Sequence, residues 1–439
     1  MSTRNTERSD PTALVTRAPA PAPRHDAPRH HPAAAARLAT ISGEGALTVL
    51  SRSAVLEAQG RNIAQLAIGE PQFAVAPHIV QAAVEALGQG DARYGPPAGL
   101  PALRAAIAAT LGSRQVDAAA EDVIVTPGAK PMLLYAFLAT VDPGAEVLIP
   151  DPGFPIYPSL ARFTGGVPVG YALDPAHGFT PDIDDIAARI TARTRVLVLN
   201  APHNPTGGSI DSAALERLAE LVLRHDLIVI SDEIYGRVVY DGDATPSIAA
   251  LPGLRDRTII VDGFSKTYAM TGWRLGFGLV PHWLVDRLTT LVVNGHTCTP
   301  PFIQRAGIAA LTGPQDQVHA MVAELRRRRD QVVAALRAIP GVRCASPAGA
   351  FYAFPDVSDV LAATGLTAPQ LAERLLEEHG VALLPGNGFG PAGASNFRIS
   401  FAGTATAVRD GLDRLATGIA AITSATRQPA PASPDASRN

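Results

Sequence analysis

The stretch from Thr258 to Pro281, TIIVDGFSKTYAMTGWRLGFGLVP, decides how the rest of the chain is interpreted. Its β-branched run ends at Gly263, and the polar residues Ser265 and Lys266 follow. Arg274 lies eight residues beyond the lysine and opens a second apolar run. Apolar runs of this length, bounded by glycine, are typical of strands. The stretch therefore predicts a strand, a polar turn and a second strand.

Lysine is rare in this chain. Of the 37 basic residues only Lys130 and Lys266 are lysines, and all the others are arginines. A desolvated lysine can lose its proton and form a Schiff base with a carbonyl group, which arginine cannot do. Two chance survivors of a drift to arginine would explain the count equally well. The neighbours favour a covalent role for Lys266, because Ser265 and Arg274 supply a hydroxyl and a planar cation suited to a phosphate.

The segment SKTYAMTGWRLG resembles the lysine segment of fold type I pyridoxal-phosphate enzymes in the class I/II aminotransferase family, which includes bacterial aspartate and aromatic-amino-acid aminotransferases. The resemblance extends from about Leu47 to Thr417. It implies pyridoxal 5'-phosphate as the cofactor, with Lys266 as the catalytic residue that holds it in a Schiff base. Ser265 and Arg274 would bind the cofactor phosphate.

Composition and charge exclude several other classes of protein. The chain has 439 residues, is 47% hydrophobic and 18% charged, and is long enough for two globular domains. A formal charge of -3 gives no basic field for nucleic acid or an anionic membrane. The run Arg326 to Arg329 lies in a helical pattern, Val318 to Leu336, and we expect it to form a solvated helix face.

The cysteines and the apolar runs predict a soluble, cytoplasmic protein without a metal site. Cys298 and Cys344 cannot build a disulfide framework and do not form a CxxC pair, which favours a reducing compartment. No apolar run reaches the ~18 residues of a membrane span. The N-terminus lacks the apolar stretch of a signal peptide.

Six short apolar runs alternate with helical patterns between Asp122 and Gly263: VIVT, EVLIP, VPVGYAL, RVLVLN, LIVISDE and TIIVDG. Buried runs separated by helices indicate an α/β fold with a mostly parallel mixed sheet covered by helices. Ligands of such sheets bind at the carboxyl ends of the strands. The residues that follow each run are therefore candidates for ligand binding.

The first two runs are followed by candidate cofactor-binding residues. After VIVT come Gly128, Ala129 and Lys130, at the start of a helix expected to run to about Thr140. Small residues at a helix N-terminus expose backbone N–H groups to a phosphate, and a lysine in that first turn favours an anion nearby. After EVLIP, Phe154 matches the family's aromatic residue that stacks on the cofactor ring.

After RVLVLN comes NPTG, in which Asn204 is similar to the family asparagine that bonds the cofactor's phenolate oxygen beside the substrate. At the end of LIVISDE lies the family's DExY motif, with Asp232 and Tyr235. In the family these two residues belong to the catalytic site. A carboxylate held against the pyridine nitrogen keeps that nitrogen protonated, so the ring can accept electrons. A helix cap or a turn residue is the simpler explanation for Asp232 taken alone.

Three further candidates lie outside the predicted sheet. Gly69, in LAIGEPQF, resembles the turn near the substrate carboxylate, and Arg398, in NFRISFA, matches the family arginine that binds that carboxylate. Tyr94 begins a segment, RYGPPAGLPALRAAIA, similar to the signature whose tyrosine reaches the phosphate of the neighbouring subunit. The resemblance thus implies a homodimer, although a surface tyrosine and a surface arginine are the ordinary alternatives.

The predicted organisation has five parts. Residues 1–36 and 425–439 are predicted to be disordered, residues 37–75 to form an N-terminal helix and arm, 76–313 the large cofactor-binding domain and 314–424 the small α+β domain. The sequence at Gly388, Gly390 and Gly393 matches GxGxxG. A strand follows these glycines where a nucleotide-binding site needs a helix, so we reject that function.

The predicted reaction is ping-pong exchange of an amino group between an L-amino acid and a 2-oxo acid. Lys130 could bind a second substrate carboxylate, which predicts glutamate with 2-oxoglutarate, or aspartate, as one pair. A phosphate contact or surface ion pair explains Lys130 equally well. A lyase, replacement or decarboxylating enzyme of the same fold is an alternative. A transcriptional regulator is another, but the first 36 residues are too short and proline-rich for a DNA-binding domain.

Overall fold

The computed structural model describes residues 34–41, 43, 45–242 and 244–427. The described residues from Arg37 onward belong to one compact unit. The predicted N-terminal extension, apart from its last three residues, lies outside the described residues, as do residues 428–439 of the predicted C-terminal tail. The last helix, α14 (Ala405–Arg427), includes the first three residues of that tail.

One mixed sheet of eight strands supports the candidate site. The strand order is β2-β9-β8-β7-β6-β3-β4-β5, and the run from β8 to β4 is parallel. Strands β2, β9 and β5 pair antiparallel with their neighbours. The six apolar runs are all strands, which confirms the predicted mostly parallel sheet. The bounds are β2 (Val123–Thr126), β3 (Glu146–Asp151), β4 (Val167–Asp174), β5 (Thr180–Pro181), β6 (Thr194–Asn200), β7 (Ile228–Asp232), β8 (Thr258–Gly263) and β9 (Gly276–Leu279).

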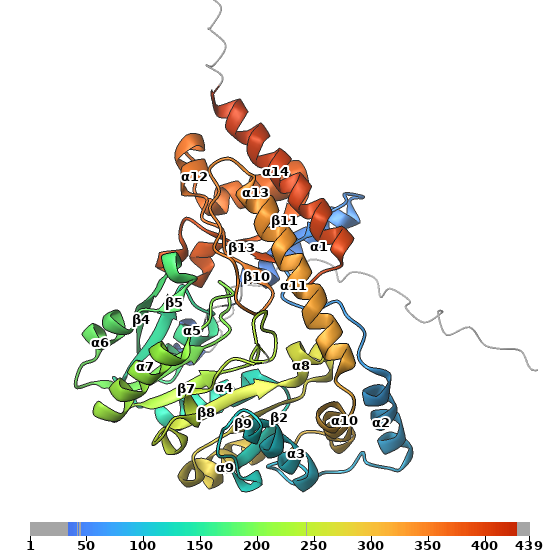
Figure 1. Ribbon diagram of the computed structural model, residues 1–439, viewed down its shortest axis with the longest axis vertical. Coiled ribbons are helices and arrows are strands. Elements are labelled where there is room, and N and C mark those ends of the chain that lie inside the picture. The colour runs from blue at the N-terminus through green and yellow to red at the C-terminus, as the bar shows by residue number, and fades with distance from the viewer. Residues whose placement is uncertain (1–33, 42, 44, 243, 428–439) are drawn as a thin grey trace, which may run out of the picture. The chain divides into compact units, whose positions relative to one another are not determined.

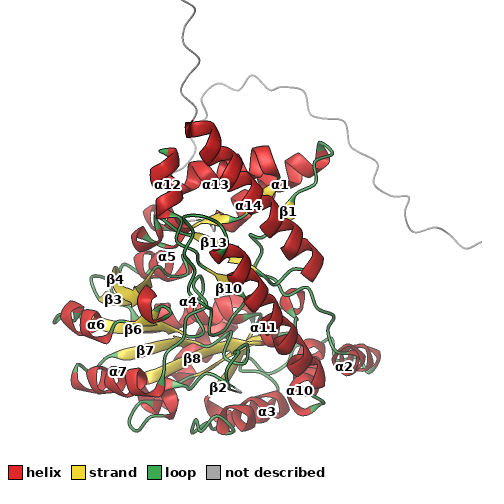
Figure 2. Cartoon of the chain, turned by 45° about the horizontal axis from the view of Figure 1, so that its top comes forward, coloured by secondary structure: helices red, strands yellow, loops and turns green. Residues whose placement is uncertain are grey.

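Helices cover both faces of this sheet because the strands are apolar on both sides. In β6, Leu197 and Leu199 pack in one cluster with α6 and α7, whereas Val196 and Val198 pack on the other face with α4, α5 and α9. Figure 2 shows the strands between these helices. Their bounds are α4 (Ala129–Thr140), α5 (Ile156–Phe163), α6 (Ile183–Arg189), α7 (Ser212–Arg224) and α9 (Val285–His296). The helix predicted to end at about Thr140 does so.

A third core cluster joins the β2–β9 edge of the sheet to three helices. These are α2 (Pro77–Gly88), α3 (Pro101–Gly112) and α10 (Pro301–Thr312). Each begins with a proline at its first turn, where the missing N–H is not needed and the fixed φ suits a helix.

A second group of elements comes from both ends of the described chain. Its three-stranded antiparallel sheet contains β10 (Tyr352–Ala353), β13 (Phe397–Ser400) and β12 (Leu384–Pro385). Strand β1 (Ala64–Gln65) pairs parallel with β11 (Val381–Ala382), which joins the N-terminal segment to the C-terminal one. Figure 1 shows α11 beside α14 in this group. The predicted domain boundaries remain predictions. The helices are α1 (Gly45–Ala58), α11 (Asp316–Arg337), α12 (Ser358–Thr364), α13 (Ala368–His379) and α14.

The segment after β8 differs from the predicted polar turn. Residues Phe264–Thr267 form a short helix, α8, because the amide of Tyr268 donates to the carbonyl of Phe264 and closes one helical turn. A 3-10 helix, Thr271–Trp273, then leads to Arg274 and β9. Both flanking strands are as predicted, and the lysine lies on a helical turn.

The expectation of a solvated arginine face on α11 is wrong for two of its four residues. Arg328 and Arg329 are buried, whereas Arg326 and Arg327 are exposed. The guanidinium of Arg328 lies 4.8 Å from the ring centre of Phe73, and that of Arg329 lies 4.9 Å from the ring centre of Tyr240. Aromatic faces accept guanidinium groups well, and sequence spacing does not reveal these distant partners.

The close approach of β9 to the start of α4 generates a stability prediction. A Cβ atom on Gly276 would lie 2.4 Å from the carbonyl carbon of Gly128 and 2.5 Å from the nitrogen of Ala129. These are backbone atoms, so the strand or the helix must shift. We expect Gly276→Ala to cost about 1–3 kcal/mol and to lower the thermal unfolding midpoint. The control, Gly272→Ala, places its Cβ where no atom lies within 4 Å. Equal midpoints for the two variants would contradict the packing argument.

Candidate functional site

A cavity of about 360 Å³ opens at the carboxyl edge of the parallel strands. A volume of this size suits a small organic cofactor or substrate. Eleven of the residues predicted from the sequence line it: Gly69, Ala129, Lys130, Phe154, Asn204, Asp232, Tyr235, Ser265, Lys266, Arg274 and Arg398. The register of the sheet explains this convergence, because Asn200 of β6 lies opposite Asp232 of β7.

Lys266 is a half-buried amine with an unusual environment. Its Nζ donates a hydrogen bond to the carbonyl of Gly69 at 2.7 Å and lies 5.8 Å from the ring centre of Phe351. Burial lowers its pKa from the ordinary 10.5 to about 8, and the nearby cations Arg398, Lys130 and Arg274 act in the same direction. A large share of this amine is therefore unprotonated slightly above neutral pH, as a nucleophile requires.

Asp232 is a buried carboxylate at the end of β7. The hydroxyl of Tyr157 donates to its Oδ2 at 2.8 Å, and the amide of Ile234 donates to Oδ1 at 3.3 Å. Burial raises the pKa of Asp232 to about 6, although these two hydrogen bonds oppose the shift. This carboxylate faces the cavity with one strong donor already in place, and it can accept from a positively charged ring N–H.

The start of α4 and Arg274 form a cationic end of the cavity. Helix α4 has no side-chain cap at its N-cap residue, Gly128, whose φ is 91°. A Cβ there would lie 2.2 Å from Nη2 of Arg274, so glycine is what allows this guanidinium to approach the helix. The guanidinium of Arg274 donates to the carbonyl oxygens of Thr271 and Pro127. Both of these acceptors are neutral, so they do not cancel its positive charge. With the hydroxyl of Ser265 beside it, this end of the cavity suits a phosphate.

Arg398 forms the opposite, buried end. Its guanidinium lies between two rings, 4.6 Å from the centre of Tyr352 and 5.0 Å from that of Phe389. Nη1 donates to Oδ1 of Asn204 and Nη2 to the carbonyl of Ala67, while the buried Nε has no hydrogen-bond partner. A planar arginine held in this way presents its remaining donors to a carboxylate.

The structure adds residues that the sequence reasoning missed. These are Leu133, Tyr157, Asn200, Ile234, Thr271 and Tyr352. Tyr352 is the most informative of these. Its hydroxyl forms a hydrogen bond of 2.8 Å with the hydroxyl of Tyr235. A Cβ atom on Gly69 would lie 2.1 Å from the same hydroxyl oxygen, so glycine at position 69 leaves room for it. Tyr157 lies on the first turn of α5, three residues after the predicted Phe154, so helical spacing from Phe154 was a usable signal for it.

The remaining predicted residues differ in position. Nζ of Lys130 lies 5.7 Å from the ring centre of Phe154, and Phe154 packs edge-on against Tyr157. Gly128 borders the cavity through its contact with Arg274. Tyr94 does not line the cavity, and 87% of its surface is exposed on the single chain.

The described part of the chain contains neither a metal-binding cluster nor a membrane-spanning helix. In residues 34–427, apart from positions 42, 44 and 243, no group of three or more His, Cys, Asp or Glu side chains could hold a metal ion. Within the same part of the chain, every helix is too short or too polar to cross a membrane.

Comparison with known proteins agrees with this geometry. The sequence profile of the family described as aminotransferase class I and II matches residues 61–415. The chain is 39% identical to an aspartate aminotransferase of Pyrococcus abyssi, over 81% of this chain and 91% of that one. It is 38% identical to an arginine–pyruvate transaminase of Pseudomonas aeruginosa, over 86% of this chain and 95% of that one.

The fold also matches solved structures. Aspartate aminotransferase from Thermus thermophilus with maleate superposes with a TM-score of 0.82 at 35% sequence identity. The match covers 88% of this chain and all of that one.

The environment of Lys266 generates a prediction for the cofactor-free protein. In Lys130→Ala, Lys266 is the one ε-amine left in the chain. Its labelling by acetic anhydride, followed by mass spectrometry across pH, should show a midpoint well below the ordinary value in the folded protein, and somewhat above 8 because the charge of Lys130 has been removed. The urea-unfolded protein is the control and should show the ordinary value near 10.5. A folded-state midpoint that equals the unfolded one would mean that burial does not activate this amine.

Proposed function

We propose, from the premise that this chain belongs to the aminotransferase class I and II family, that glutamate with 2-oxoglutarate, or aspartate, is one of its substrate pairs. The chain is a pyridoxal 5'-phosphate-dependent aminotransferase, which exchanges an amino group between an amino acid and a 2-oxo acid. The observation that carries the residue assignments is one cavity with a buried amine, a buried carboxylate and a cationic site at each end.

The side chains present fit this cofactor. Ser265, Arg274 and the N-terminus of α4 would hold its phosphate, and Asp232 would hold its ring nitrogen. The bound cofactor supplies an electron sink for the pair of electrons left when a bond at the substrate α-carbon breaks. Phe154 would pack on the ring, while Asn204 and Tyr235 would bond its phenolic oxygen. Lys266 would attach it covalently.

Lys266 has the properties of the proton-transfer residue. Its amine is held at the carbonyl of Gly69 inside the cavity, and its lowered pKa leaves it able to accept a proton from the substrate α-carbon. The same amine, once protonated, can return the proton at a second position. Asp232 does not take part in this proton transfer. The hydrogen bond from Tyr157 holds its carboxylate in position, where its negative charge faces the cavity.

Substrate recognition divides between the two ends of the cavity. Arg398 would bind the α-carboxylate, which every amino acid and 2-oxo acid shares, with Gly69 lining the cavity beside it. Lys130, at the exposed side near Phe154, would bind a second carboxylate. The Thermus relative was solved with maleate, a dicarboxylate, which supports the proposal. The arginine–pyruvate relative shows that the family also serves other side chains.

The proposed active form is a cytoplasmic homodimer. Tyr94 lies in an exposed loop of the single chain, away from its own cavity, and would complete the phosphate site of the partner subunit. Both cysteines are free thiols, which is consistent with a reducing compartment.

Lys266→Ala should abolish covalent attachment and lower the rate of amino transfer by at least about 10³-fold, because one residue supplies both functions. The measurement is borohydride reduction, denaturation and detection of cofactor that remains on the chain. Lys130→Ala is the control and should retain the cofactor after the same treatment. Retention in Lys266→Ala would show that another group carries it.

Lys130→Ala should raise KM for glutamate or aspartate by about 10- to 100-fold, because it removes a charge-assisted bond of ~1.5 to 3 kcal/mol. KM for an aromatic substrate, measured on the same preparation, should change little. Equal losses for acidic and aromatic substrates would assign Lys130 to the cofactor phosphate and remove the basis for the proposed pair.

Sedimentation velocity at assay concentration should show a dimer. Tyr94→Phe should weaken cofactor binding without dissociating the dimer, because the variant loses only a hydroxyl that we assign to the partner's phosphate site. A fully active monomer would refute the shared site.

A further inference from the structure

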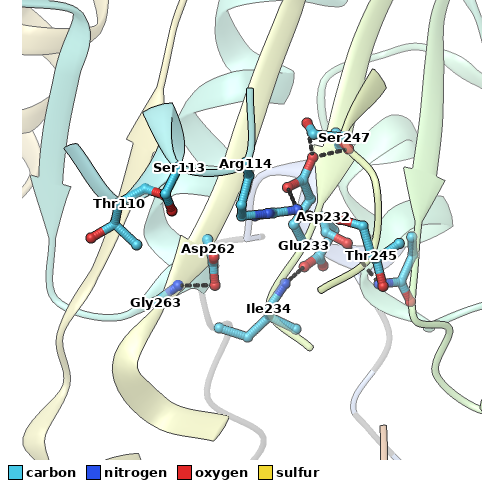
Figure 3. Close-up of polar contacts among 12 residues, drawn as sticks. Thr110, Ser113, Arg114, Asp232, Glu233, Ile234, Thr245, Ser247, Asp262 and Gly263 are labelled. Carbon is cyan, nitrogen blue, oxygen red and sulfur yellow. Dashed lines mark hydrogen bonds and ion pairs between the residues drawn. The ribbon is translucent and has the colours of Figure 1, made fainter. Parts of the chain in front are cut away.

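A buried charge cluster lies directly behind Asp232 and outside the cavity. Figure 3 shows Arg114, which follows helix α3, pointing toward Glu233, the residue next to Asp232. Asp262 of the neighbouring strand β8 lies on the other side of the same guanidinium. Of these residues only Asp232 lines the candidate site. The reaction described above assigns no task to Arg114, Glu233 or Asp262.

The cluster is tightly held. Nη2 of Arg114 lies 2.7 Å from Oε2 of Glu233, and each side chain is less than a tenth exposed. The ion pair leaves Nε of Arg114 without a hydrogen-bond partner. Nη2 also donates to the carbonyl of Thr245 at 2.9 Å. The hydroxyls of Ser231 and Ser247 donate to Oε1 of Glu233, at 3.0 and 2.6 Å.

The charges in this cluster act on one another. Glu233 raises the pKa of both Asp232 and Asp262, and Arg114 lowers that of Asp262. Burial is the larger cause in each case, even for Asp262, which keeps some surface exposure but is surrounded by protein atoms. Among the described residues, Arg114 is the only cation that forms an ion pair with Glu233. The other titratable groups that act on Asp232 are Tyr157, Tyr235, Asp262 and Lys266.

We propose that Arg114 and Glu233 are positioning residues that set how strongly Asp232 binds a proton. The inference rests on the proposed function, in which Asp232 must remain a carboxylate so that the cofactor ring keeps its proton. With Arg114 in place, its positive charge opposes the effect of Glu233 on Asp232. Without Arg114, the unbalanced carboxylate makes Asp232 a stronger base, which competes with the ring for the proton.

The sign of the effect distinguishes this role from a purely structural one. Removing a positive charge raises the pKa of every nearby group, and removing a negative charge lowers it. Arg114→Met and Glu233→Gln should therefore shift a titration at the active site in opposite directions. The double variant restores the net charge of the cluster and should titrate close to the wild type. Loss of packing alone would weaken the site in both single variants without opposite shifts.

The experiment measures the pH midpoint of the visible absorbance of the holoenzyme, together with the Kd of pyridoxal 5'-phosphate and the thermal midpoint. We expect Arg114→Met to raise the pH midpoint by about 0.5 to 1 unit and Glu233→Gln to lower it by a similar amount. Arg114→Lys keeps the charge with different geometry and should stay near the wild-type value. If Arg114→Met fails to fold, Glu233→Gln still decides the question, because a pH midpoint that is unchanged or raised in that variant would overturn the inference.

The matched control is a second ion pair that is far from the cavity lining. Arg255 lies 2.6 Å from Asp122, and both side chains are mostly buried. Arg255→Met should lower the thermal midpoint without moving the pH midpoint. Shifts of the same sign in Arg114→Met and Glu233→Gln, or no shift in either, would overturn the inference. A wild-type protein that binds no cofactor would instead overturn the proposed function, so the two failures are distinguishable.

Discussion

The burial of charge at the carboxyl edge of the parallel strands is the constraint on which the rest of the structure depends. Asp232 ends one strand and Glu233 comes directly after it, while Lys266 follows the neighbouring strand. Both carboxylates are buried, so each charge needs a partner from another element. Tyr157 supplies one for Asp232 and Arg114 one for Glu233. Tyr157 comes from α5, and Arg114 follows α3. The helices that pack on the sheet therefore supply the partners of the charges at the strand ends.

The same constraint separates the two ends of the cavity. Arg398 is buried and fixed between two aromatic rings, which suits a group common to all substrates. Arg274 and Lys130 are exposed on the single chain, where a phosphate and a variable side chain can reach them.

Much of the fold could be predicted from the sequence because the signals were local. Each apolar run became a strand, and small residues after VIVT began α4 at Ala129. The misses on α11 and in the cavity lining depend on distant partners. Arg328 and Arg329 are buried because Phe73 and Tyr240 offer aromatic faces, and Tyr352 enters the cavity because Gly69 leaves room for its hydroxyl. The spacing of residues along the chain reveals none of these contacts. The ion pair of Arg114 with Glu233 could not be predicted for the same reason.

The central claim is that the carboxylate of Asp232 holds the proton on the ring nitrogen of the cofactor. The most direct test is the ¹⁵N chemical shift of pyridoxal 5'-phosphate labelled at the ring nitrogen and bound to the wild-type enzyme at neutral pH. The account predicts the shift of a protonated pyridine in the wild type and that of an unprotonated one in Asp232→Asn. An unprotonated ring nitrogen in the wild type would contradict the account.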